Sequence, residues 1–110
     1  SDSNDNFYLS YDEATLNEYK IANLQFNRMG RTLGISGKIE SKKFENVVAF
    51  RFQALVFHEG KLIEDCYLED YFMKSSGEWY FQGNCDEIHY ESFELPFTMD
   101  VNIRAVKFRR

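Results

Sequence analysis

Apolar and polar residues alternate with a period of two along most of the chain, which is the pattern of half-buried β-strands. The longest such run covers residues 45–58, and the apolar residues on its more apolar face are Val48, Phe50, Phe52, Ala54 and Val56. We expect this strand to run through the middle of a sheet, because it is the longest and most apolar in the chain.

Shorter runs with the same period flank it, and corners that contain Gly or polar residues separate them. They cover residues 6–11, 20–26, 32–40, 62–72, 78–85, 87–95 and 100–108. Residues 12–18 carry a helix-start signal but leave room for no more than about two turns. The pattern predicts an all-β, antiparallel two-sheet sandwich, immunoglobulin-like, with seven to eight strands. A small barrel is the alternative.

Length and composition make the chain a single module. A chain of 110 residues has room for one core, so residues 7–110 are expected to form one β-sandwich domain. Aromatic residues make up 17 % of the chain, which favours strands over helices. Residues 1–6, SDSNDN, are expected to form a polar N-terminal tether, of the kind that would follow a removed signal or lipid-anchor sequence.

The net charge of −5 has the wrong sign for neutralising phosphates, so nucleic acid is not an expected partner. Apolar runs stay shorter than the ~18 residues that a membrane span needs, and we expect no membrane insertion. The remaining partner classes are a protein or a glycan. The oligomeric state is not specified by the sequence.

The two cysteines lie on neighbouring candidate strands. If residues 74–77, KSSG, form a four-residue hairpin loop, every directly opposed pair of residue numbers adds to 151, which sets Cys66 opposite Cys85. Opposed residues at a non-hydrogen-bonded site bring their Cβ atoms to roughly 4.5 Å, near the upper end of the disulfide range. A Cys66–Cys85 disulfide is therefore predicted, and with it an extracytoplasmic location, either secreted or anchored to the cell envelope. Two free cysteines buried in a reducing cytosol are the alternative.

The same register predicts an aromatic surface on this hairpin. Trp79 and Phe81 are assigned to the core side, which leaves Tyr67, Tyr71 and Tyr80 as an exposed stripe. Flat amphipathic rings of this kind suit sugar stacking or a protein hot spot. If the two faces are reversed, Trp79 becomes the exposed ring. An outer sheet face that is merely rich in tyrosine is the alternative.

Catalytic and metal-binding patterns are missing from the sequence. It contains no phosphate-binding Gly-rich loop, no nucleophile elbow and no cofactor motif. Neither His58 nor His89 has the partners that would complete a zinc site, and Cys85 is assigned to the disulfide. We therefore expect no catalytic residue, no metal and no cofactor.

One stretch, GKIESKKFENVVAFRFQALVFHEGKLIED (residues 37–65), resembles the small immunoglobulin-like FxLYD-type domains of secreted bacterial proteins. The shared parts are a G-x-I strand, a long alternating strand at residues 48–57, and an acidic Gly turn followed by apolar residues. The resemblance implies the same fold and an envelope address, and it implies no site. Residues 41–43, Ser-Lys-Lys, replace the Asn of that pattern, and the aromatic strand EWYFQG with the cysteines is not part of it.

A shorter segment, KKFENVVAFRF, is similar to part of the starch- and glycogen-binding sandwich modules, through Phe44, Glu45, Val48 and Arg51. The Trp-Asp signature and the Asn-rich sugar-binding segment of those modules are absent from this chain. The function expected from the sequence is a non-enzymatic, extracytoplasmic interaction or accessory domain. A carbohydrate-binding module that uses the aromatic hairpin is the rival.

Overall fold

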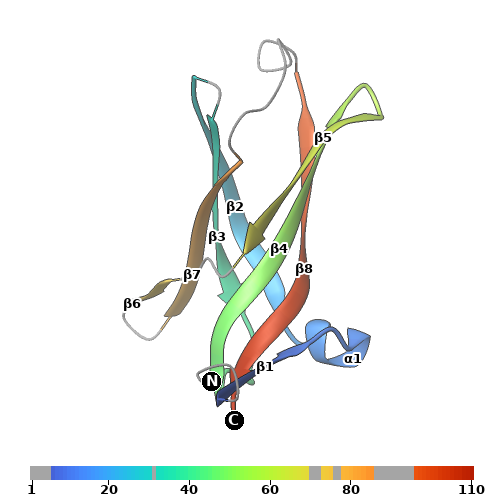
Figure 1. Ribbon diagram of the computed structural model, residues 1–110. Coiled ribbons are helices and arrows are strands. Elements are labelled where there is room, and N and C mark those ends of the chain that lie inside the picture. The colour runs from blue at the N-terminus through green and yellow to red at the C-terminus, as the bar shows by residue number, and fades with distance from the viewer. Residues whose placement is uncertain (1–5, 31, 70–72, 76–77, 86–95) are drawn as a thin grey trace.

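Two antiparallel sheets pack face to face, with the central strands of each sheet facing one another (Figure 1). The computed structural model describes residues 6–30, 32–69, 73–75, 78–85 and 96–110. One sheet has the spatial order β1-β8-β4-β5 and the other β2-β3-β7-β6. The all-β two-sheet sandwich is confirmed.

The described residues hold eight strands and one short helix. Their bounds are β1 Phe7–Ser10, α1 Glu13–Leu16, β2 Lys20–Met29, β3 Thr32–Glu40, β4 Val47–His58, β5 Lys61–Glu69, β6 Met73–Ser75, β7 Glu78–Cys85 and β8 Thr98–Arg109. Helix α1 is a single turn, and the Asp12 side chain caps it by accepting a hydrogen bond from the Thr15 amide. Within the described residues, no helix is long and apolar enough to cross a membrane.

The strand order agrees with an immunoglobulin-like architecture, with one difference: β1 occupies the position that the last strand, G, has in immunoglobulin domains. Immunoglobulin sheets have the orders A-B-E-D and G-F-C-C′. Here β2-β3-β7-β6 corresponds to the first, and β1-β8-β4-β5 to the second. Strand β1 pairs antiparallel with the end of β8, from Phe7 opposite Arg109 to Ser10 opposite Val106. It thus takes the position of strand G beside strand F.

Strand β4 lies between β8 and β5, as expected of the longest apolar strand. Phe50, Phe52, Ala54 and Val56 are buried, which confirms most of the predicted inner face. Val48 is the exception, because it is only half-buried while Val47 is buried. The register between β4 and β8 slips between Val47 and Ala49, and a slip of one residue exchanges the two faces of a strand.

Aromatic rings from both sheets fill the space between them. Phe52 of β4 stacks on Phe81 of β7 with ring centroids 4.3 Å apart. Phe50 meets the edge of Trp79, and Trp79 stacks on Phe44 at 4.9 Å. These contacts bury the rings of β7 against β4 and anchor one sheet to the other.

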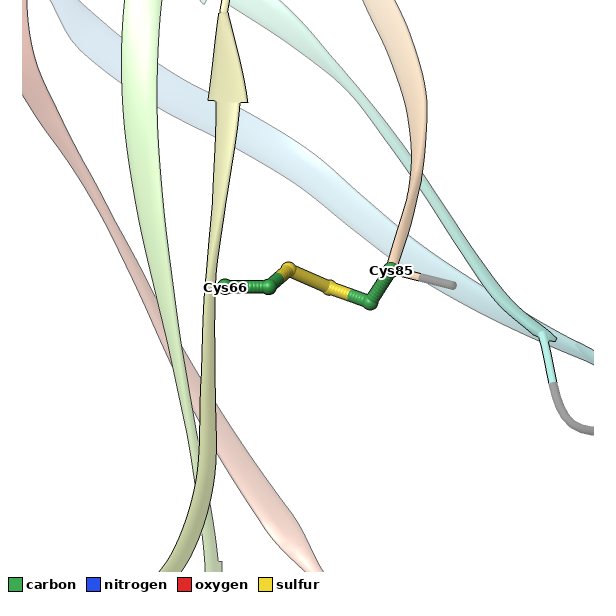
Figure 2. Close-up of a disulfide and its surroundings, with 2 residues drawn as sticks. All are labelled: Cys66 and Cys85. Carbon is green, nitrogen blue, oxygen red and sulfur yellow. A yellow bond between two sulfur atoms is a disulfide. The ribbon is translucent and has the colours of Figure 1, made fainter. Parts of the chain in front are cut away.

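The predicted disulfide between Cys66 and Cys85 is present, but it joins two sheets and not two strands of one hairpin (Figure 2). Cys66 lies on β5, opposite Ala54 of β4, whereas Cys85 lies on β7, opposite Leu33 of β3. Their Cα atoms are 5.9 Å apart, within the range that a disulfide spans.

The predicted hairpin between residues 62–72 and 78–85 is wrong, and so are its opposed pairs. The hairpin partner of β7 is the three-residue strand β6, with Ser75 opposite Glu78 and Met73 opposite Tyr80. Two residues, not four, separate the paired ends. The chain changes sheets between β5 and β6, which a pattern of alternating residues does not reveal.

Several predictions concern residues outside the described part of the chain. These are residues 1–5 of the polar tether, Tyr71, His89 and the strand expected at residues 87–95.

Gly37 lies beneath the Phe81 ring, and the first prediction concerns it. A Cβ atom at Gly37 would stand 2.7 Å from Phe81 Cε1, so we expect Gly37→Ala to lower the free energy of unfolding by about 1–3 kcal/mol. The control is Gly34→Ala on the same strand, where the nearest atoms are at 3.4 Å. Urea unfolding of both variants measures the difference, and equal effects would contradict the close approach of Phe81.

The inter-sheet disulfide gives the second prediction. The bond closes a segment with a sequence separation of 19, so its reduction should lower the free energy of unfolding by about 3 kcal/mol. Denaturant unfolding with and without a reducing agent measures this. The control is the double variant Cys66→Ala/Cys85→Ala, whose stability should not respond to the reducing agent. Two thiols that react with an alkylating agent in the unreduced native protein would exclude the bond.

Candidate functional site

Two of the three tyrosines predicted to form one stripe, Tyr67 and Tyr80, lie on opposite sides of the molecule. Tyr67 projects from the outer face of β5 and is 62 % exposed. It accepts a hydrogen bond from Gln53 Nε2 at 3.1 Å. Tyr80 lies on β7, on the outer face of the other sheet, and is half-buried. A single surface containing Tyr67 and Tyr80 is therefore not formed, and Tyr71 is outside the described residues.

Trp79 points into the core, with only 7 % of its surface exposed. The prediction that Trp79 and Phe81 face inward is confirmed, and the reversed assignment with an exposed Trp79 does not hold. Sugar stacking on Trp79 would require the ring to leave its contacts with Phe44 and Phe50.

Around Tyr80, the outer face of β2, β3 and β7 carries a polar trough. It consists of two adjoining hollows of about 350 and 420 Å³ that share Gln25, Ser36 and Gln82. We define the trough by nine of the residues that line these hollows: Asn23, Gln25 and Asn27 of β2; Gly34, Ser36 and Lys38 of β3; and Tyr80, Gln82 and Asn84 of β7. The other lining residues are Phe26, Ile35, Gly37 and Phe81.

Strand register brings these residues into rows across the sheet. Residues paired in an antiparallel ladder point to the same face. The rows are Gln25, Ser36 and Gln82; Asn27, Gly34 and Asn84; and Lys38 with Tyr80. On β3 and β7 the inward residues alternate with them, so burial of Ile35 and Phe81 forces Ser36 and Gln82 outward.

A β-bulge completes the row on β2. The register between β2 and β3 shifts between Ala22 and Gln25, and Asn23 has a positive φ of 55°. Asn is one of the few residues with a side chain that tolerates this conformation. Bulges of this type redirect side chains at the edge of a sheet, and here Asn23 joins Gln25 in the lining.

The floor of the trough is formed by the small residues of the middle strand. Gly34 has no side chain, and the space where its Cβ would stand is approached by Asn84 Oδ1 and by the Asn27 carbonyl oxygen, both at 3.4 Å. Ser36 adds only a hydroxyl group. The longer amide side chains of β2 and β7 therefore form two walls above a low floor.

One end of the trough is closed by a hydrogen-bonded ion pair. Lys38 Nζ lies 2.6 Å from Glu78 Oε1, and Tyr80 Oη donates a hydrogen bond of 2.7 Å to Glu78 Oε2. The hydrogen bond from Lys38, and then the one from Tyr80, hold the pKa of Glu78 below its usual 4.5. The hydrogen bond to Glu78 raises the pKa of Lys38 above 10.5.

This ion pair keeps its charges at neutral pH. Because the pKa of Glu78 is lowered on folding, its contribution to stability is present above pH 4.5 and is lost as the pH falls through the lowered value. The charges of Lys38 and Glu78 offset one another, so the trough offers a ligand chiefly neutral donors and acceptors.

The sequence analysis did not predict the amide residues of this trough, although their spacing along the strands could have indicated them. Five of the eleven Asn and Gln residues of the chain line the trough, at every second position of N-L-Q-F-N and in F-Q-G-N. Asn is depleted in strand interiors, so an alternating amide row within an apolar strand is unusual. Among the predicted site residues that the structure describes, Tyr80 is the one that lies in the trough.

Other candidate groups are placed elsewhere. His58 Nδ1 donates a hydrogen bond to the Pro96 carbonyl oxygen at 2.7 Å. In the described part of the chain, no group of three or more His, Cys, Asp or Glu side chains is placed to hold a metal ion.

Comparisons with protein-family models, with curated proteins and with solved structures find no match to this chain. The functional assignment therefore rests on the geometry of the trough.

The third prediction concerns Tyr80. Glu78→Gln replaces the carboxylate that accepts its hydrogen bond, which is the main cause of the raised pKa of Tyr80, so we expect this pKa to fall toward 10.0. An NMR titration of protein with ¹³C-labelled tyrosine measures it. Glu40→Gln is the control. The charge of Glu40 raises the pKa of Lys38, but the described hydrogen bonds include none between Glu40 and Tyr80. An unchanged Tyr80 pKa in Glu78→Gln would exclude the hydrogen bond.

Proposed function

We propose that this chain is a non-enzymatic, extracytoplasmic interaction domain that binds its ligand in the trough on the β2-β3-β7 face. The observation that carries the proposal is the set of nine residues that strand register and the bulge at Asn23 gather around the two hollows. Binding sites are concave and combine a rigid frame with a small number of placed polar groups. A sheet face with aligned side chains supplies that frame.

The Cys66–Cys85 bond supports the extracytoplasmic part of the proposal. Disulfides persist in oxidising compartments and are rare in the cytosol, where thiols are kept reduced. The resemblance of residues 37–65 to FxLYD-type domains implies an envelope address and agrees with it.

The state of the ionisable groups supports binding over catalysis. A general acid or base works best when its pKa lies near the operating pH. In the trough both pKa values are shifted away from neutral pH, because the pKa of Glu78 is lowered and that of Lys38 is raised. Both groups are held in their charged forms, paired with one another, and so neither is poised to exchange a proton at neutral pH.

The fourth prediction tests the use of the trough. Protein labelled with 3-fluorotyrosine carries a reporter in the trough, Tyr80, and another on the opposite outer face, Tyr67. We expect an extracellular or envelope extract of the source organism to shift or broaden the ¹⁹F signal of Tyr80 in a saturable way and to leave that of Tyr67 unchanged.

The variants for this experiment come from the two outer faces. The double variant Gln82→Ala/Asn84→Ala should lose the response of Tyr80, because it removes the amide wall of β7. Gln53→Ala is the matched control, an amide removed from the opposite sheet. A response of Tyr67 alone, or no response of either signal, would contradict the proposed function.

A further inference from the structure

Resting on the proposed function, we infer that the ligand of the trough is an uncharged glycan, held by the amide side chains of β2 and β7 above the floor of β3. The inference names the class of ligand for the same site. It depends on the kind of polar groups present, on their spacing and on the absence of net charge among the nine residues once Lys38 is paired with Glu78.

The polar groups of the trough match those of a sugar. A sugar hydroxyl donates one hydrogen bond and accepts others, and an Asn or Gln side chain also carries both a donor and an acceptor. One planar amide can therefore serve two neighbouring hydroxyl groups at once. Five amides and the Ser36 hydroxyl provide such groups on both sides of the trough.

The sheet holds these groups at regular intervals. Neighbouring strands lie about 4.8 Å apart, and alternate residues along a strand are separated by roughly 6.5–7 Å. The two rows Gln25-Ser36-Gln82 and Asn27-Gly34-Asn84 thus form a lattice of hydrogen-bonding positions that repeats along the strands. The hollows adjoin along the same direction, as an extended chain of similar units requires.

Charge argues for a neutral sugar over an acidic one. Carboxylate and sulfate groups are bound best by Arg or by unpaired Lys. The charged residue among the nine is Lys38, and its ammonium group is already 2.6 Å from Glu78 Oε1. The chain as a whole carries a net charge of −5, which repels an anionic ligand.

A protein partner fits the trough less well. The centres of protein interfaces are enriched in large aromatic residues, Met and Arg that fill pockets on the partner. The middle strand contributes Gly34 and Ser36, the smallest side chains among the nine residues. Phe26, which is 42 % exposed and also lines the second hollow, packs against Phe97. The combined size of the hollows lies within the ~300–1,000 Å³ typical of small-ligand sites.

Tyr80 supplies an aromatic wall at one end. Its hydroxyl group is held by Glu78, which fixes the ring beside Lys38 and Gln82. An amphipathic ring in a fixed orientation can pack against the apolar face of a sugar ring while the amides bind its hydroxyl groups. Tyr80 thus keeps the role of a sugar-contacting residue, on the β2-β3-β7 face.

The fifth prediction uses the extract and the fluorotyrosine signals described above, with two treatments. Periodate cleaves vicinal diols and should abolish the response of Tyr80, whereas digestion of the extract with a protease should leave it intact. The reverse pattern would overturn the glycan inference while the proposed function stands, since the trough would then bind a protein. Failure of the untreated extract to affect Tyr80 would instead contradict the proposed function.

Defined probes complete the test. We expect at least one member of a panel of uncharged oligosaccharides of glucose, xylose, mannose or N-acetylglucosamine to bind, as measured by calorimetry. Gln82→Ala/Asn84→Ala should weaken that binding at least about tenfold, through the loss of two hydrogen-bonding groups, and Gln53→Ala should not change it. Preferential binding of oligogalacturonate, or binding of no neutral probe, would overturn the inference.

Discussion

The stacking of Phe52 on Phe81 joins the two sheets, and the outer surface depends on it. The rings meet at 4.3 Å between β4 of one sheet and β7 of the other. Gly37 of β3 makes the approach feasible, because any Cβ there would collide with Phe81. Since side chains alternate along a strand, inward burial of Trp79 and Phe81 turns Tyr80 and Gln82 outward. The core thereby determines which residues face solvent on β7.

The disulfide holds the C-terminal end of the same strand, β7. Cys85 is the last residue of β7 and follows Asn84 directly, and its bond to Cys66 ties this end to the opposite sheet. Strand β7 is therefore held by aromatic packing at Phe81 and by a covalent bond at Cys85. A binding surface on such a strand is ordered before the ligand arrives, which reduces the entropy lost on binding.

Local patterns in the sequence predicted the strands better than their arrangement. Burial of Phe50 and Phe52 follows from alternation alone, whereas the half-burial of Val48 depends on a register slip that only the neighbouring strand shows. The pairing of Cys66 with Cys85 was predicted correctly, but from an incorrect hairpin. The two cysteines were expected on neighbouring strands of one sheet, and they meet between the two sheets. Of the trough, only Tyr80 was predicted, since amides on an outer face look like ordinary solvated residues until the register aligns them.

The composition of the trough is unfavourable for the sheet that carries it. Asn and Gly are depleted in strands, yet Asn27, Gly34 and Asn84 form one row across three of them. Threonine at these outer positions would suit a solvated sheet better. Where a local rule is broken, the explanation is commonly a functional site whose cost is offset elsewhere in the structure. Here the aromatic core and the inter-sheet disulfide stabilise the sandwich that carries these residues. Because the unfavourable residues gather at the trough, we propose the ligand site there and not at the exposed ring of Tyr67.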